Sequence, residues 1–348
     1  MRIAKPEFEA MLREGIAHHS DGPWASPLHL LLKKTEGWQP CGDYHALNAR
    51  TIPDRYPVHN IHYFAHRIYS CHGFSVLDLV KAYTHIPVYP HDAPKTAIIT
   101  PFGLFDFPFM SFGLRNDGQA FQSFIDEVVH GIDFCFVYLD DILVFSRNAD
   151  EHHAHLRLLY QRLDDHGLLL NVPKSTLGIS IVIFLGHEVS SEGTRHLPQR
   201  ITNLENYPQP TTAKDVHRFL GMQNVCRPFL PHAADYLTPL HDALAGLRGN
   251  QPITRTPALT QVFEDCKAAL CTATLLCHPV PDTPLGLFTD ASNFAIGATL
   301  MQRVDNTWHH LAFFSKKLSA RNTASSAAST TNETPSSSPP YYRDLLSI

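Results

Sequence analysis

Short apolar runs, some of them interrupted by single acids, fill the first half of the chain. The runs FSVLDLV at 74–80 and FCFVYLDDILVFS at 134–146 are rich in β-branched and aromatic residues, which favours strands. Because aspartate favours turns, the second run predicts two strands that are joined at Asp140 and Asp141. SPLHLLLKK, from residue 26, and FLGHEVSSEG, from residue 184, predict further strands.

Other segments show the three-to-four-residue spacing of amphipathic helices. Helices are predicted over 7–16, from about Gln119 to Val129, over 151–166 and over 259–270. A further helix is expected in TTAKDVHRFLG, where Thr212 and Asp215 stand three residues apart and predict a capping box.

The C-terminal part returns to strand-like patterns. LGLFTDASNFAIGATLMQ and HHLAFFSKKL predict strands, with Asp290 inside an apolar run. Residues 245–257 have the composition of a linker. Residues 319–340 are Ser, Thr, Ala and Pro with almost no large apolar side chain, and such a segment is expected to be disordered.

Composition limits the class of protein. A chain of 348 residues that is 44% hydrophobic can form a core, and its length predicts two or three domains. No apolar run is long enough for a transmembrane helix, and the charged N-terminus lacks a signal core, so we expect a soluble intracellular protein without a membrane partner. The net charge of −5 does not favour nucleic-acid binding, although local patches and metal ions can dominate a site.

Cysteine and histidine do not predict a metal site. The seven cysteines are scattered without a CxxC pair, so neither a zinc ribbon nor a disulfide framework is indicated. The 23 histidines fit no metal-binding spacing. The cluster in EHHAHLRLL, on the predicted helix at 151–166, is interpreted as a solvated helix face.

Asp78, Asp140 and Asp141 each stand at the end or turn of a strongly apolar strand. Carboxylates held close together at low dielectric repel, which raises the pKa of at least one of them. Mg²⁺ prefers hard oxygen ligands, and two such ions can support phosphoryl transfer. Simpler interpretations stay open: the acidic pair can be only a turn, Asp78 a hydrogen-bonded core acid, and Asp290 a turn cap.

The segment FVYLDDILVFS resembles the YxDD signature of reverse transcriptases. Other segments resemble, in the same order, successive blocks of the polymerase of gypsy-type long-terminal-repeat retrotransposons; they include GPWASPLHLLLKK, FSVLDLVKAYTHIPV, PKTAIITPFGLFDF, FGLRNDGQAFQSFIDEV, FLGHEVSSEG, LFTDASNFAIGATL and LAFFSKKLS. The resemblance covers about residues 7–348.

This resemblance implies an α+β fold: a right-hand polymerase with fingers, palm and thumb, followed by a partial RNase H-like α/β domain. Fingers and palm are expected over 1–190 and a helical thumb-like or connection segment over 191–255. The N-terminal part of the RNase H-like domain is expected over 256–348, with the disordered insert at 319–340.

The resemblance also implies the polymerase residues. Asp78, Asp140 and Asp141 match the catalytic acids, which would bind two Mg²⁺ ions, or Mn²⁺, with the backbone carbonyl of Leu79 as a further ligand. Tyr83 matches the steric gate against a ribose 2′-hydroxyl, because a ring packed under the sugar leaves no room for that oxygen. The remaining matches are Phe112 in the nucleotide pocket, Lys33 and Lys34 near the triphosphate, Lys174 as a lysine proposed to protonate pyrophosphate, and a primer grip at Phe184, Leu185, Gly186 and His187.

In the C-terminal domain, Asp290 and Asp344 match two acids of ribonuclease H, with aspartate at 344 where glutamate is usual. The family needs two more acids beyond that point, so we expect no ribonuclease H activity from this chain.

Four substitutions depart from the family pattern. Gln39 and His45 replace arginines, Ser111 replaces a proline and His85 replaces a glutamine. Glutamine at 39 supplies neither charge nor a bidentate fork for the triphosphate.

The expected function is RNA-directed DNA synthesis in the cytoplasm, within a retroelement particle, or in the nucleus. A primed RNA or DNA template and deoxynucleoside triphosphates are the expected partners, and the sequence leaves the oligomeric state open. Two alternatives remain: a remnant that binds nucleic acid without extending a primer, and a metal-dependent nuclease centred on Asp290.

Overall fold

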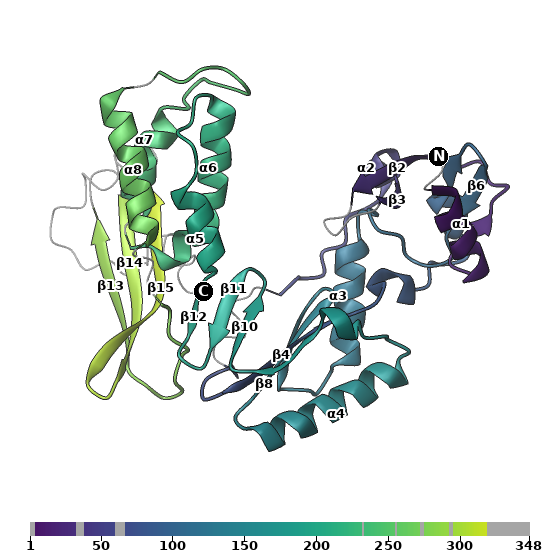
Figure 1. The fold of residues 1–348 in the computed structure, drawn as a ribbon, viewed down its shortest axis with the longest axis horizontal. Helices are drawn as coiled ribbons and strands as arrows, with labels where there is room; N and C mark the ends of the chain where they lie inside the picture. The colour runs from purple at the N-terminus through teal and green to yellow at the C-terminus, as the bar shows by residue number, and fades with distance from the viewer. Residues whose placement is uncertain are drawn as a thin grey trace, which may run out of the picture. The chain divides into compact units, whose positions relative to one another are not determined.

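The computed structural model describes residues 4–32, 38–59, 67–231, 233–254, 256–271, 275–291 and 295–318. The chain forms two compact units, Met1–Asn60 with Gly73–Ile179 and Ile61–His72 with Ser180–Ile348. Figure 1 shows the elements of each unit. Both units combine helices with mostly antiparallel sheets, which confirms the α+β class.

A four-stranded antiparallel sheet forms the centre of the first unit. Its order is β7 (Cys135–Tyr138), β8 (Asp141–Ser146), β4 (Gly73–Asp78) and β9 (Thr176–Ile179). Helices α3 (Asp117–Val128) and α4 (Ala149–Asp165) pack on this sheet, because Leu77, Ile125 and Leu159 belong to one buried cluster. The apolar runs around the acids are therefore the strands of a packed core.

A second sheet of the same unit has the order β1 (His18–His19), β6 (Gly103–Asp106), β5 (Ile98–Thr100), β2 (Ser26–Leu32) and β3 (Trp38–Gly42). Its core contains Phe8 of helix α1 (Ala4–Arg13), together with Tyr44, Ile98 and Phe105. Helix α2 (His45–Arg50) follows Tyr44 directly. The described part of the unit also contains the 3₁₀ helices η2 (Ala82–His85), η3 (Ala93–Thr96) and η4 (Val172–Lys174).

The second unit contains two three-stranded antiparallel sheets and a group of helices. The sheets are β10 (Ile181–Phe184), β11 (His187–Ser190) and β12 (Thr194–His196), and β13 (Leu285–Ala291), β14 (Ala295–Val304) and β15 (Thr307–Lys317). The helices are α5 (Pro198–Glu205), α6 (Ala213–Cys226), η5 (Arg227–Phe229), α7 (Ala233–Asp242) and α8 (Pro257–Cys271). Phe219, Leu237 and Phe263 join α6, α7 and α8 in one core.

Most of the predicted elements are confirmed, with shifts of a few residues. The capping box is present at the start of α6, where Thr212 Oγ1 accepts a hydrogen bond from Asp215 N–H at 3.3 Å. Residues 245–254 contain no helix or strand, and α8 begins at Pro257. Among the described residues, Cys41, Cys226 and Cys277 carry free thiols. None of the described helices is both long and apolar enough to cross a membrane.

Two predictions are wrong in detail. The hairpin turn consists of Leu139 and Asp140, because Asp141 already pairs with Tyr138 as the first residue of β8. The histidine cluster of α4 is not simply a solvated face, because the His152 side chain is buried.

A buried polar cluster explains the position of His152. Its Nε2 lies 2.7 Å from Ser75 Oγ, and its Nδ1 lies 2.8 Å from Ser146 Oγ. His155 also contacts Ser146, and its ring stacks on Phe134. A satisfied hydrogen-bond network thus offsets the cost of burying the imidazole.

Candidate active site

The two central strands bring Asp78 and Asp141 together. Strands β4 and β8 are antiparallel, and Asp78 at the end of β4 pairs with Asp141 at the start of β8. The end of β4 is held by Asn171 N–H, which donates to the Asp78 carbonyl at 2.8 Å. The pairing of β4 with β8 thus places two carboxylates that are far apart in the sequence at the same end of the sheet.

The third acid, Asp140, lies in the turn between β7 and β8. Leu139, the other turn residue, has a φ of +53°, which is uncommon for a residue with a side chain. Two-residue hairpin turns need such a conformation to follow the twist of their strands, and glycine or asparagine usually supplies it. The turn at the acids is therefore backbone-strained, as is frequent at functional sites.

The three carboxylates influence one another electrostatically. Burial, followed by the nearby charges of Asp140 and Asp78, raises the pKa of Asp141 to about 6. Like charges in a partly buried position oppose ionisation unless a cation compensates them.

Three carboxylates are the hard oxygen donors that Mg²⁺ prefers, so the chemistry of the set fits a divalent cation. Within the described ranges, however, no three or more His, Cys, Asp or Glu side chains converge as metal ligands. The fit to a divalent cation therefore rests on the carboxylate chemistry and on the mutual repulsion of the acids.

Leu79 follows Asp78 and is buried. It forms a bridge with Leu170, and the two hydrogen bonds of this bridge use Val80 N–H and the Asp78 carbonyl. The Leu79 carbonyl takes part in neither bond.

Tyr83 lies in η2, beside the acids. Burial, with the charges of Asp140 and Asp117, raises the pKa of Tyr83 to about 12. Its ring centroid lies 6.3 Å from that of Phe112 and 5.5 Å from that of Phe121. The structure therefore brings Tyr83, Phe112 and Asp140 into one neighbourhood.

Phe112, which is half exposed, borders a hollow of about 310 Å³. The lining also includes His29, Cys41, Gly42, Asp43, Tyr44, His45, Asn48 and Gly113. Asn48 links α2 to the loop that contains Phe112, because its Nδ2 donates to the carbonyl of the next residue, Gly113, at 2.9 Å. Sequence reasoning found Phe112 and His45 here but missed Asn48.

His45 is an exposed side chain, and its Nδ1 is hydrogen-bonded to Asp43 Oδ1. The hydrogen bond from His45 holds the pKa of Asp43 below its ordinary value. Gln39, in β3, is exposed and pairs with Leu31 of β2. Lys33 and Lys34 lie outside the described residues.

The segment expected to grip the primer is a tight hairpin of the second unit. Phe184 and His187 pair across β10 and β11, and Leu185 and Gly186 form the turn with φ values of +47° and +78°. Phe184 and His187 are buried, whereas Leu185 and Gly186 are partly exposed. The proposed pyrophosphate lysine, Lys174, is an exposed residue of η4 in the first unit.

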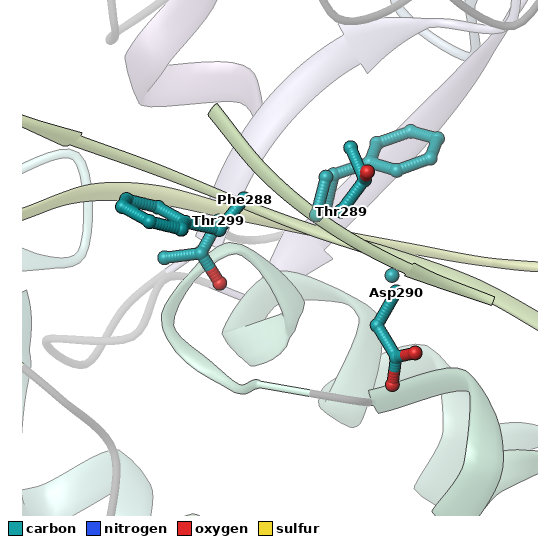
Figure 2. Close-up of a pocket in the computed structure, with 7 residues that line it drawn as sticks. Phe288, Thr289, Asp290 and Thr299 are labelled. Carbon is teal, nitrogen blue, oxygen red and sulfur yellow. The ribbon is translucent and has the colours of Figure 1, made fainter. Parts of the chain in front are cut away.

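Asp290 lies in β13, opposite Gly297 of β14. It borders a hollow of about 250 Å³ with Phe288, Thr289 and Thr299. Figure 2 shows the Thr289 and Asp290 side chains leaving β13 on opposite sides, as successive residues of a strand do. Asp344 and the insert at 319–340 lie outside the described residues, so the expected absence of ribonuclease H activity stays a prediction.

Comparison with known families agrees with the geometry. Residues 31–221 match the model of the family described as reverse transcriptase (RNA-dependent DNA polymerase). Residues 256–331 match the RNase H-like domain found in reverse transcriptases.

Similar proteins include polyproteins of transposons. The Pol polyprotein of transposon opus from Drosophila melanogaster is 34% identical over 90% of this chain, which covers 33% of that protein. The Pol polyprotein of transposon gypsy from the same organism is 30% identical over 85% of the chain, which covers 30% of that protein. The chain thus spans about a third of the length of these relatives.

The structure of a foamy viral protease-reverse transcriptase in complex with an RNA/DNA hybrid superposes on this chain with a TM-score of 0.81 and 21% sequence identity. The match covers 92% of this chain and 44% of the foamy viral chain. This likeness confirms the expected polymerase fold.

Proposed function

The chain belongs to the reverse transcriptase family, and we propose that it is an RNA-directed DNA polymerase from the Pol polyprotein of a gypsy-type retrotransposon. One observation carries the proposal: Asp78 and Asp141 face each other across β4 and β8, with Asp140 in the adjoining turn. Three carboxylates at one sheet end are costly for stability, and nucleotidyl transfer is a function that requires them.

The proposed metal ligands are the carboxylates of Asp78, Asp140 and Asp141 and the backbone carbonyl of Leu79. Two Mg²⁺ ions, or Mn²⁺ in their place, would lower the pKa of the primer 3′-hydroxyl and neutralise the triphosphate. The strained turn and the paired strand ends keep the carboxylates in place before substrate binds, so little reorganisation is needed during the reaction.

The nucleotide would lie against Tyr83 and Phe112. Tyr83 is packed between Phe112 and Phe121, which limits how far its ring can move away from a bound sugar. A ring held in this way supports the role of a steric gate against a 2′-hydroxyl. Lys33 and Lys34 would contact the triphosphate.

The macromolecular partner would be a primed RNA or DNA template. The foamy viral enzyme of similar fold was solved with an RNA/DNA hybrid, which supports this class of partner. The hairpin from Phe184 to His187 would contact the primer strand. Because the net charge of the chain is −5, binding would depend on local basic patches and on the metal ions.

The proposed domain organisation has three parts: fingers and palm over 1–190, a thumb-like or connection segment over 191–255 and an RNase H-like part over 256–348. Residues of the first part would carry the polymerase chemistry.

A second candidate function is binding of a hybrid without extension. Gln39 carries no charge and is a weak replacement for an arginine that contacts the triphosphate. His45, which replaces another arginine, is already paired with Asp43. This pairing is the observation that favours the second candidate.

One sample can separate the two functions. Binding of a fluorescent RNA/DNA primer–template and incorporation of one deoxynucleotide are measured on the same protein, with Mg²⁺ and with a chelator. Binding with Mg²⁺-dependent incorporation supports the polymerase. Binding without incorporation in Mg²⁺ or Mn²⁺ supports the second candidate.

A further inference from the structure

A fully buried glutamine lies directly beneath the acidic turn. Gln122 of α3 has no exposed surface. Its Oε1 accepts a hydrogen bond from Leu139 N–H at 2.9 Å. Its Nε2 donates to Asp126 Oδ1 at 2.9 Å and to the Val137 carbonyl at 3.3 Å. Both ends of the buried amide are therefore used, and one of them holds the strained residue of the turn.

The orientation of this amide depends on Asp126. An ionised carboxylate can only accept hydrogen bonds, so it selects the Nε2 end of Gln122. Reversing the amide would place Oε1 against the carboxylate and an NH₂ group against Leu139 N–H. Asp126, one helical turn away from Gln122, thus determines which atom Leu139 meets.

Asp126 is itself held from a separate segment. Tyr56 Oη donates to Asp126 Oδ2 at 2.8 Å, and His59 Nε2 lies 3.0 Å from the same oxygen. The hydrogen bond to Asp126 raises the pKa of Tyr56. The same segment is tied to the start of α3, where Asn116 Nδ2 donates to the Ile52 carbonyl at 2.9 Å. The carboxylate is therefore fixed by groups that lie outside the sheet.

We propose that Asp126 is a positioning residue for nucleotidyl transfer: through Gln122 it holds Leu139 in the conformation that places Asp140 and Asp141. The inference rests on the proposed polymerase function for its kinetic consequence. Its structural consequence, the protection of the Leu139 amide, is independent of activity. Neither Gln122 nor Asp126 touches a reacting atom, so both act through the turn.

A charge exchange between the two residues tests the proposal. In Gln122→Glu, two carboxylates face each other, and the side chain at position 122 turns away from Leu139. In the double variant, Gln122→Glu with Asp126→Asn, the new amide at position 126 can donate to the new carboxylate at position 122. That carboxylate can then accept again from Leu139 N–H. Complementarity towards position 126 and Leu139 N–H is thus restored with the donor and acceptor exchanged, whereas the Val137 carbonyl receives no donor from position 122.

The α4 pair Gln161 and Asp165 supplies a matched control. Gln161 Nε2 donates to Asp165 Oδ1 at 2.9 Å, with the same spacing of four residues but on an exposed surface. Gln161→Glu, alone and with Asp165→Asn, therefore repeats the chemistry away from the turn.

Two readouts are measured on the full chain. Hydrogen–deuterium exchange of a peptide covering 134–146 reports the Leu139 amide, and steady-state incorporation of one deoxynucleotide reports kcat and KM. For Gln122→Glu we expect faster exchange in this peptide and a kcat that is lower by about 10–100-fold, with hybrid affinity unchanged. The double variant is expected to recover at least about tenfold of kcat and the slow exchange.

Unchanged exchange in Gln122→Glu, or a double variant no better than this single variant, would overturn the proposal. An equal loss in the Gln161 control would also overturn it, because the effect would then be general. If the wild type does not incorporate nucleotides, the proposed function fails, while the exchange measurement still decides whether Asp126 and Gln122 hold the turn.

Discussion

Asp78 and Asp141 are direct cross-strand partners at the end of the two central strands of the first unit. Like charges directly opposite each other destabilise an antiparallel pair. The apolar cluster around Leu77, Ile142 and Val144 holds the strands together despite this repulsion. The fold thus keeps acids in a position that is unfavourable for stability and suitable for binding cations.

Replacing Asp141 with asparagine is expected to stabilise the metal-free protein at about pH 7.5. The pKa of Asp141 is raised to about 6, so its contribution to stability is lost as the pH rises through 6, and an amide avoids this loss. Because the side chain is only partly buried, we expect a gain of about 1 kcal/mol in the free energy of unfolding.

Urea denaturation in the presence of a chelator measures this gain. The exposed acid Asp150 provides the control, since Asp150→Asn should not raise the stability. An Asp141→Asn protein that is equally or less stable than wild type would contradict the account. The same variant should lose primer extension.

Shortening Tyr83 is expected to weaken the selection against ribonucleotides. In Tyr83→Ala the ring that would occlude the 2′-hydroxyl is absent, and relative incorporation of ribonucleotides should rise by roughly 10–100-fold. Tyr83→Phe keeps the ring between Phe112 and Phe121 and should keep the selection.

The ratio of kcat/KM for a ribonucleotide and the matching deoxynucleotide measures this effect. A ratio that stays the same in the alanine variant would show that another group excludes the 2′-hydroxyl.

Restoring arginine at positions 39 and 45 is expected to increase nucleotide incorporation. Gln39 has no charge, and His45 is paired with Asp43, whereas arginine offers a fixed positive fork to a triphosphate. We expect kcat/KM of Gln39→Arg with His45→Arg to rise by up to about 10²-fold.

Single-nucleotide kinetics on a primed RNA template provide the test. His153→Arg, which adds an arginine at an exposed position of α4, controls for the general increase in positive charge. If kcat/KM rises equally in this control, the gain comes from a higher affinity for the hybrid and not from contacts with the triphosphate.

The contribution of His196 to stability is expected to fall as the pH is lowered from about 6.5 towards 4. The buried His196 has a pKa lowered to about 4, mainly because burial disfavours its charged form. Below about pH 6.5 the unfolded chain takes up a proton that the folded chain does not bind, so the free energy of unfolding decreases. The expected contribution of His196 is about 1–3 kcal/mol.

His196→Leu should therefore make stability less dependent on pH over this range. Denaturant unfolding at about pH 7 and about pH 4.5 measures the difference, and the exposed His153 gives the control variant His153→Leu. A variant at 196 with the same pH dependence as wild type would refute the assignment.

The sequence predicted the central strands well because their residues favour strands both locally and through burial. It missed β5 and β6, short strands of the first unit that are joined by the turn at Pro101 and Phe102. Within the helical segment expected over 191–255 it did not delimit α7, which contains Pro239, a residue that normally ends a helix. In these elements tertiary packing overrides the local signals.

The acids of the candidate site were predictable because charged residues inside apolar runs are conspicuous. The side chains that surround the acids were not predictable from the sequence. Gln122 and Asp126 look like ordinary polar positions of a helix, and only the packing of α3 against β7 shows that the first is buried and bonded to the turn. His152 was interpreted as solvated for the same reason, since its partner Ser75 is distant in the sequence.

The proposed function assigns RNA-templated DNA synthesis to the acidic turn. Extension of a DNA primer on an RNA template in Mg²⁺ tests it most directly, with wild type, Asp140→Asn and the exposed control Asp150→Asn compared as folded proteins. We expect extension by wild type and by Asp150→Asn and none by Asp140→Asn. Extension by Asp140→Asn at the wild-type rate, or no extension by any of the three in Mg²⁺ or Mn²⁺, would contradict it.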